Sequence, residues 1–95
     1  MYYLLHYDYV ANIVERREPF RPGHLGLAKA FEEQGKIILA GATGNPVTGA
    51  TFAFQVDSID EIQDFIDRDP YVANNLVTSW RIEPWTVVIG SAYQP

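Results

Sequence analysis

The sequence predicts an α+β domain whose elements follow the order strand, helix, strand, strand, helix, strand, which is the ferredoxin-like arrangement. Three observations lead to this prediction. Four stretches are rich in the aromatic, aliphatic and β-branched residues that favour strands. Two stretches between them repeat apolar residues at helical spacing. The length of 95 residues fits one small domain, since domains are commonest at about 100–150 residues.

In the first half of the chain, residues 2–9 form the first predicted strand, because Tyr and Leu dominate them and no Gly or Pro interrupts. Residues 10–20 contain a charged run and predict a loop or a short irregular helix. Pro22 fits the first turn of a helix, where its missing N–H costs nothing. Apolar residues then recur at spacings of three and four until Gly35, so we expect a helix over 22–34.

The middle of the chain predicts a hairpin followed by the second helix. Residues 36–42 form a short apolar strand, and residues 51–56 alternate large apolar with small or polar side chains, as a partner strand does. Ser58 and Glu61 have the spacing of a capping box, in which each side chain bonds a free N–H of the first helical turn. We expect the helix over 59–67.

Two prolines constrain the predicted elements in the last part of the chain. The residue before a proline is pushed out of the helical region, so Asp69-Pro70 ends the second helix. Residues 71–75 add at most one further turn. Residues 76–89 form the last predicted strand, and Pro84 within it has no N–H for a ladder. We therefore expect this strand to be bent, bulged or at an edge of the sheet.

The aromatic content predicts more than one covered face. Tyr, Phe and Trp make up 14% of the chain, and the first and last strands carry apolar residues on both faces. Two helices cover only one face, and a second uncovered apolar face would be unusually large for a monomer. We therefore expect a two-fold homodimer that packs sheet against sheet. The single domain spans residues 1–90, and residues 91–95 form a C-terminal tail.

Composition and charge exclude several functional classes. The net charge of −5 argues against binding to nucleic acid, which requires basic surfaces. The absence of cysteine excludes disulfides and Cys-based zinc sites and fits a reducing compartment, so we expect the cytoplasm. No apolar run approaches the roughly 20 residues of a membrane span, and no signal peptide is visible.

Two histidines are the candidates for acid–base chemistry. His6 lies on the first predicted strand among Tyr and Leu, where we expect packing. His24 lies in the first turn of the first helix, on its apolar stripe, and therefore faces the sheet. A histidine there can serve as a general base, although a hydrogen-bonded boundary histidine is an equally simple interpretation. No metal-ligand spacing, phosphate-binding loop or Ser-His-Asp order occurs, so we expect no metal and no cofactor.

Several short motifs occur in a fixed order along the chain. They are Arg21-Pro22-Gly23-His24-Leu25, Gly35-x-Ile37-x-x-Ala40-Gly41, Ser58-x-x-Glu61, Asp69-Pro70-Tyr71-Val72-Ala73 and the closing Glu83-Pro84-Trp85. In this order and with these spacings the chain resembles the YCII-related (YciI-like) proteins over about residues 1–89. Each motif is weak alone, and their succession is specific.

The resemblance implies both an architecture and a site. It implies the dimeric α/β-barrel superfamily, in which two ferredoxin-like protomers join their sheets into one barrel. It also implies an active site on the histidine of Arg-x-x-His and the aspartate of Asp-Pro, here His24 and Asp69. Asp69 would then fix the tautomer of His24, the base. Arg21, one helical turn before His24, would hold an anionic group of the substrate, unless it is a solvated surface charge.

The expected function follows from these residues and from the resemblance. One branch of the family is associated with removing halide from chlorinated hydroxyquinols, and the superfamily includes muconolactone isomerase. We expect a cofactor-independent enzyme of the dehydrohalogenase, isomerase or lyase type that acts on a small cyclic or aromatic organic substrate. It would work as a homodimer or a larger assembly, without nucleic acid or membrane partners. Two alternatives remain: a non-catalytic ligand-binding or accessory dimer with His24 and Asp69 as polar anchors, and a structural interaction module without an enclosed cavity.

Overall fold

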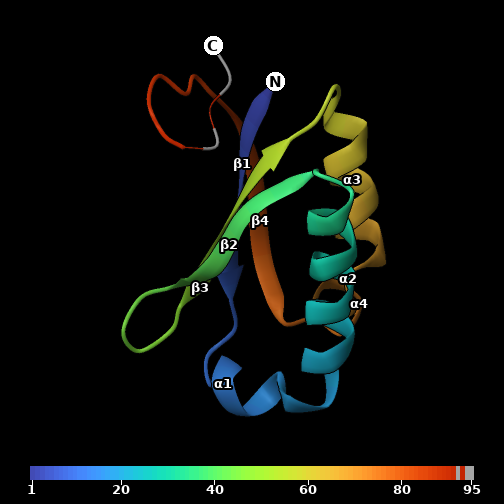
Figure 1. The fold of residues 1–95 in the computed structure, drawn as a ribbon. Helices are drawn as coiled ribbons and strands as arrows, with labels where there is room; N and C mark the ends of the chain where they lie inside the picture. The colour runs from blue at the N-terminus through green and yellow to red at the C-terminus, as the bar shows by residue number, and fades with distance from the viewer. Residues whose placement is uncertain (92, 94–95) are drawn as a thin grey trace.

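The computed structural model of the chain describes residues 1–91 and 93, and its main elements follow the predicted order (Figure 1). The strands are β1 (Tyr2–Tyr9), β2 (Ile37–Thr43), β3 (Gly49–Gln55) and β4 (Val77–Trp85). The helices are α1 (Ile13–Arg16), the 3-10 helix η1 (Glu18–Phe20), α2 (Arg21–Glu33), α3 (Ile59–Arg68) and α4 (Pro70–Ala73). The strands pair antiparallel in the order β2-β3-β1-β4. The predicted α+β ferredoxin-like fold is confirmed.

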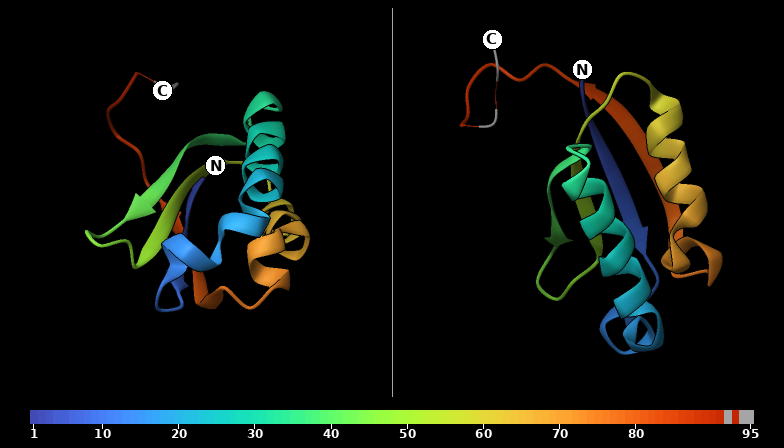
Figure 2. Two further views of the ribbon diagram at one scale, coloured as in Figure 1. Left: turned by 90° about the horizontal axis from the view of Figure 1, so that it is seen from below. Right: turned by 45° about the vertical axis from the view of Figure 1, so that its right-hand side comes forward.

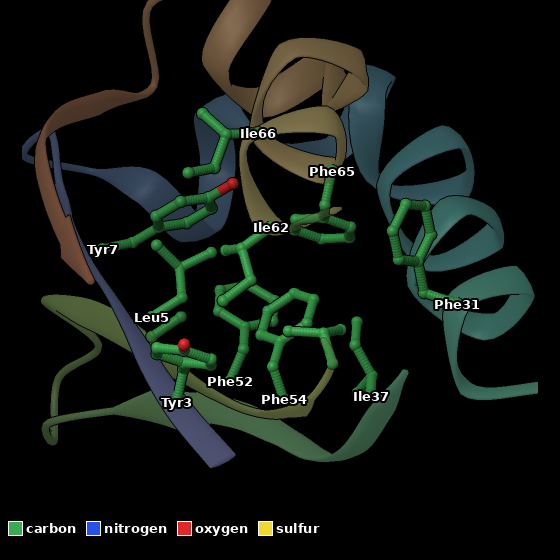
Figure 3. Close-up of a cluster of buried hydrophobic side chains, with 12 residues drawn as sticks. Tyr3, Leu5, Tyr7, Phe31, Ile37, Phe52, Phe54, Ile62, Phe65 and Ile66 are labelled. Atoms are coloured by element: carbon green, nitrogen blue, oxygen red, sulfur yellow. The ribbon is translucent and has the colours of Figure 1, made fainter. Parts of the chain in front are cut away.

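Helices α2 and α3 lie on the same face of the sheet, which we call the inner face (Figure 2). The core fills the space between them and the strands (Figure 3). Because side chains alternate along a strand, every second residue of β1 is buried here: Tyr3, Leu5 and Tyr7. Helix α3 contributes Phe65, whose ring lies 5.2–5.6 Å from three other phenylalanine rings. Aromatic rings from the sheet and both main helices therefore make up a large part of this core.

The local signals around α3 behave as predicted. The capping box of Ser58 and Glu61 is present at its first turn, and the Glu61 carboxylate accepts the Ser58 N–H at 3.3 Å. The helix ends at Arg68. Asp69 is extended, with φ −73° and ψ 119°, because Pro70 excludes the helical conformation at this position. The chain then makes the single further turn of α4.

The structure corrects the extent of the last strand. β4 ends at Trp85 rather than at residue 89. The physical reason is its position at the edge of the sheet, where β1 is its only partner. Trp85 pairs with Tyr2, the first residue of β1, so no paired strand is left for the residues that follow. Pro84 is thus on an edge strand, one of the predicted settings. Of the predicted tail, residues 92, 94 and 95 lie outside the described residues.

The opposite face of the sheet, which we call the outer face, is apolar in part and carries no helix among residues 1–91 and 93 (Figure 2). Leu39 and Trp85 on this face are 74% and 43% exposed. Tyr2 and Leu4 beside them are half-buried. The sequence prediction of a sheet with apolar residues on both faces is therefore met. No helix in the described part of the chain has the length and apolarity needed to cross a membrane.

Candidate active site

Asp69 is the centre of the candidate site, and its position is fixed by its own backbone. It precedes Pro70, so it is extended and acts as the N-cap of α4. Its Oδ1 accepts the N–H of Tyr71 at 3.0 Å, which satisfies one of the free donors of that helix. The side chain is fully buried, at 0% exposure. A buried carboxylate is costly unless it is well hydrogen-bonded, and the following contacts provide those bonds.

His24 reaches Asp69 from the first turn of α2. Its Nδ1 lies 2.8 Å from Asp69 Oδ1, and the residue is only 7% exposed. Its ring stacks on that of Tyr71, with ring centres 3.8 Å apart and planes 4° from parallel. Gly23 allows the first turn of α2 to pack closely against Pro70 of α4, because a Cβ atom at position 23 would lie only 3.2 Å from Cγ of Pro70. The two sequence motifs thus meet, and the structure places the predicted pair in direct contact.

Tyr7 is the third residue at this carboxylate. Its hydroxyl donates to Asp69 Oδ2 at 2.8 Å, so the carboxylate accepts from a phenol, an imidazole and a backbone N–H. Burial, followed by the charge of Asp69, raises the pKa of Tyr7 far above its usual range. The phenol therefore stays protonated and remains a donor to Asp69. Both carboxylate oxygens are occupied, which fixes the orientation of Asp69 and hence of the His24 ring.

This geometry determines which nitrogen of His24 is available. A carboxylate only accepts hydrogen bonds, so Nδ1 of a neutral imidazole must carry the proton that it shares with Asp69. The lone pair then resides on Nε2, which has no hydrogen-bond partner among the described residues. His24 also lines a cavity of about 230 Å³. The arrangement can supply a general base with a fixed tautomer.

The cavity lies between α2 and the β2–β3 edge of the sheet. Its walls are mostly small or apolar, formed by Leu25, Ala28, Ala40, Gly41, Ala42, Ala50 and Phe52. A cavity of about 150 Å³ is already enough for benzene, so about 230 Å³ accommodates a single substituted ring. The polar side chains that line it are His24, Tyr9, Tyr71 and two arginines.

Arg21 is the first residue of α2 and lines the cavity, as its predicted role requires. Arg17, between α1 and η1, lines it as well. Burial raises the pKa of Tyr9, while the positive charges of Arg17 and Arg21 act in the opposite direction. Burial also raises the pKa of Tyr71, and the charges of the same two arginines again oppose this rise without cancelling it. The positive charges of both arginines thus oppose the rise in the pKa of both tyrosines, and all four side chains line the same cavity.

His6 takes no part in this site. It lies on the outer face, where Nε2 is 2.7 Å from Glu83 Oε1 and Nδ1 is 3.2 Å from Thr51 Oγ1. It is held by polar partners rather than by the packing that we expected. Within residues 1–91 and 93, no group of three or more His, Cys, Asp or Glu side chains is placed to bind a metal ion.

The sequence interpretation missed three residues of the site. Tyr7 is predicted only as part of the strand over residues 2–9, and strand alternation does not indicate which hydroxyl meets a carboxylate. Tyr71 was named only within a motif, without a role. Arg17 was assigned to a charged loop. The signal that was available for Arg17 is its spacing of four residues from Arg21, which places both side chains near one helix start.

Comparisons with known proteins agree with this fold and with the motifs. The YCII-related domain matches residues 1–86. The protein YciI of Escherichia coli O6:H1 is 27% identical over 97 aligned positions, which cover 93% of this chain and 99% of that protein. The YciI protein of Shigella flexneri gives the same values. An uncharacterised protein of Haemophilus influenzae is 26% identical over the same shares of the two chains.

A solved structure has the same fold at lower sequence identity. It is the 5-chloro-2-hydroxyhydroquinone dehydrochlorinase of Burkholderia phenoliruptrix AC1100, in complex with 2,5-dihydroxybenzoquinone. The TM-score is 0.76 and the identity is 21%, over 90% of this chain and 94% of that one. At this identity the similarity establishes the shared fold.

Proposed function

The chain belongs to the family of YCII-related domain proteins, and on this basis we propose that it is a small acid–base enzyme with His24 as the base and Asp69 as the residue that orients it. Its substrate is a small cyclic or aromatic organic molecule bound in the cavity beside His24. The observation that carries the proposal is the buried 2.8 Å contact between Nδ1 of His24 and Oδ1 of Asp69 at the wall of a cavity. The dehydrochlorinase with the same fold supports the class of chemistry.

The chemical step requires only the transfer of a proton and the departure of a leaving group. Nε2 of His24 takes a proton from an O–H or C–H group of the substrate, and the electron pair of that bond stays on the substrate. In a dehydrochlorination, chloride leaves with the electrons of the C–Cl bond, so the substrate loses HCl and no oxidant is needed. In an isomerisation, the same nitrogen returns the proton to another atom. Asp69 stabilises the imidazolium that forms between the two transfers.

The test is turnover by purified variants. Chloride release is followed with 5-chloro-2-hydroxyhydroquinone, and isomerisation is followed with a panel of cyclic lactones. Because a general base contributes about 10²–10⁴-fold, His24→Gln should lower the rate of any substrate turned over by at least about 100-fold. Asp69→Asn should lower it as well. His6→Gln is the matched control, since His6 lies on the opposite face of the sheet, and it should retain the full rate. Turnover that survives both site substitutions contradicts the proposal.

A non-catalytic ligand-binding dimer is the alternative, and the cavity beside His24 supports it equally. It predicts that molecules of the same class bind with an affinity that depends on His24, and that they are recovered unchanged after long incubation. The purely structural module was expected to lack an enclosed cavity; the partly open cavity of about 230 Å³ beside His24 supports ligand binding instead.

The proposal includes a cytoplasmic homodimer joined through the outer face. Support comes from the exposure of Leu39 and Trp85 there, because large apolar patches are rare on monomers. The chain has no cysteine, as suits a reducing compartment. In sedimentation experiments the wild-type chain should have the mass of two copies, and Leu39→Glu should shift it to one. Val14→Glu, at an exposed apolar site on α1 away from the outer face, should leave the mass unchanged. A wild-type monomer refutes this part.

A further inference from the structure

Two arginines line the candidate cavity without a protein partner. Five ion pairs occur among the described residues, and neither Arg17 nor Arg21 belongs to any of them. Glu18, which follows Arg17 in the chain, makes no ion pair with it there. Moreover, Nε of Arg17 is buried and has no hydrogen-bond partner among residues 1–91 and 93. A buried donor left without an acceptor is unfavourable, so the Arg17 side chain has unused hydrogen-bonding capacity beside the cavity that it lines.

The two guanidinium groups are held from different elements. Arg17 follows α1 and has a helical backbone, with φ −77° and ψ −17°, and its N–H donates to the carbonyl of Ile13 at 2.9 Å. Arg21 begins α2. Both act electrostatically on the phenols of Tyr9 and Tyr71, which line the same cavity. The cationic end of the cavity is therefore built into the start of α2, one helical turn from His24.

We propose that Arg17 and Arg21 form a carboxylate-binding subsite, so that the ligand of this cavity is a small aromatic or alicyclic carboxylate. One guanidinium binds the two carboxylate oxygens through parallel N–H groups, and the other adds a second positive charge beside the carboxylate. The apolar walls of alanine, leucine and phenylalanine contact the ring of the ligand. This inference rests on the proposed function, in which the cavity beside His24 binds the substrate. It adds that this substrate carries a carboxylate group.

A carboxylate fits this subsite better than a phosphate. Phosphate sites commonly use several free backbone N–H groups at a glycine-rich turn or a helix N-terminus. Here the N–H groups of Arg16, Arg17 and Phe20 donate to carbonyls of their own turns, at 2.9–3.0 Å. The cavity instead presents side-chain donors, chiefly two planar guanidinium forks, which can bind the two oxygens of a planar carboxylate through parallel N–H groups.

The test measures binding without turnover, so its result is independent of whether His24 is a catalytic base. Benzoate and its neutral analogue benzamide are titrated into the full chain by calorimetry or by NMR. Benzoate should bind at least about ten-fold more tightly than benzamide, which corresponds to about 1.4 kcal/mol. Arg17→Gln should abolish this preference and leave benzamide binding unchanged, which also shows that the cavity is intact. Arg16→Gln is the matched control, because this neighbouring arginine is exposed and does not line the cavity.

Each outcome decides for or against the subsite. A lost preference in Arg17→Gln and in Arg21→Gln, with an unchanged preference in Arg16→Gln, supports it. Equal binding of benzoate and benzamide to the wild-type chain overturns it, as does the absence of benzoate binding at tens of millimolar. Inorganic phosphate is titrated as a competitor. If it displaces benzoate at equal concentration, the assignment to carboxylates is wrong and the site is a general anion site.

Discussion

The hydrogen bond from Tyr7 to Asp69 gives a quantitative prediction for the substitution Tyr7→Phe. The hydroxyl donates to Oδ2 at 2.8 Å, and the carboxylate is fully buried. A hydrogen bond to a charged group contributes about 1.5–3 kcal/mol, and phenylalanine fills the same space without the donor. Tyr7→Phe should therefore lower the free energy of unfolding by about 2–3 kcal/mol at pH 7. A domain with about 5–15 kcal/mol of stability still folds after this loss.

The same phenol makes this difference depend on pH. Burial and Asp69 raise the pKa of Tyr7 in the folded chain above its ordinary value of 10.0. Between the two pKa values the unfolded chain has lost a proton that the folded chain keeps. The stabilisation is thus complete below pH 10 and declines above it, by about 1.4 kcal/mol for each pH unit. Phenylalanine has no such proton, so the difference between wild type and variant should shrink by about 1.4 kcal/mol at pH 11.

Urea denaturation followed by circular dichroism, at pH 7 and at pH 11, measures both quantities. Tyr3→Phe is the matched control, because Tyr3 is buried on the same face of β1 and its hydroxyl contacts only the sulfur of Met1, at 3.6 Å. It should cost less than about 1 kcal/mol, since sulfur is a weak acceptor. Equal stability of Tyr7→Phe and wild type at pH 7 would refute the reasoning, and so would a difference that stays constant between the two pH values.

Further predictions concern two glycines and one carboxylate. In Gly49→Ala the new Cβ would collide with the backbone carbonyl of Tyr7, so we expect a loss of about 1–3 kcal/mol in urea denaturation. Gly26→Ala, in α2 with open space around it, should instead gain about 0.5–1 kcal/mol, and a loss there would contradict the open space. The hydrogen bond from the backbone N–H of Asp57 lowers the pKa of the Glu61 carboxyl group. The ionised carboxylate therefore stabilises the folded chain above about pH 4.5, and this stabilisation is lost as the pH falls. The Tm deficit of Glu61→Gln should accordingly be smaller at pH 3 than at pH 7, and a constant deficit would exclude this linkage.

The features that position Asp69 and His24 are local in origin. Asp69 is placed by the proline that follows it, which forces an extended backbone and lets the side chain cap α4. His24 is placed by the phase of the apolar stripe, which turns it toward the sheet. These constraints operate within a few residues, so they can be recognised without a structure. The extent of β4 could not be predicted in this way, because it depends on where its partner β1 begins.

The sequence by itself determined the order of the elements, the apolar stripes of the two main helices, and two motifs whose His24 and Asp69 are separated by 45 positions. Tertiary structure decided what these motifs meet. The stacking of His24 on Tyr71 and the bond from Tyr7 to Asp69 join segments that are distant in the chain. The burial of Arg17 Nε without a partner likewise depends on how these segments pack. Periodicity and capping arise from backbone geometry within one element, whereas side-chain partners across elements depend on how helices and sheet pack together. The candidate pair of His24 and Asp69, and the role of Arg21, were therefore expected from the family resemblance, whereas the second arginine of the cavity, Arg17, was visible only in the folded chain.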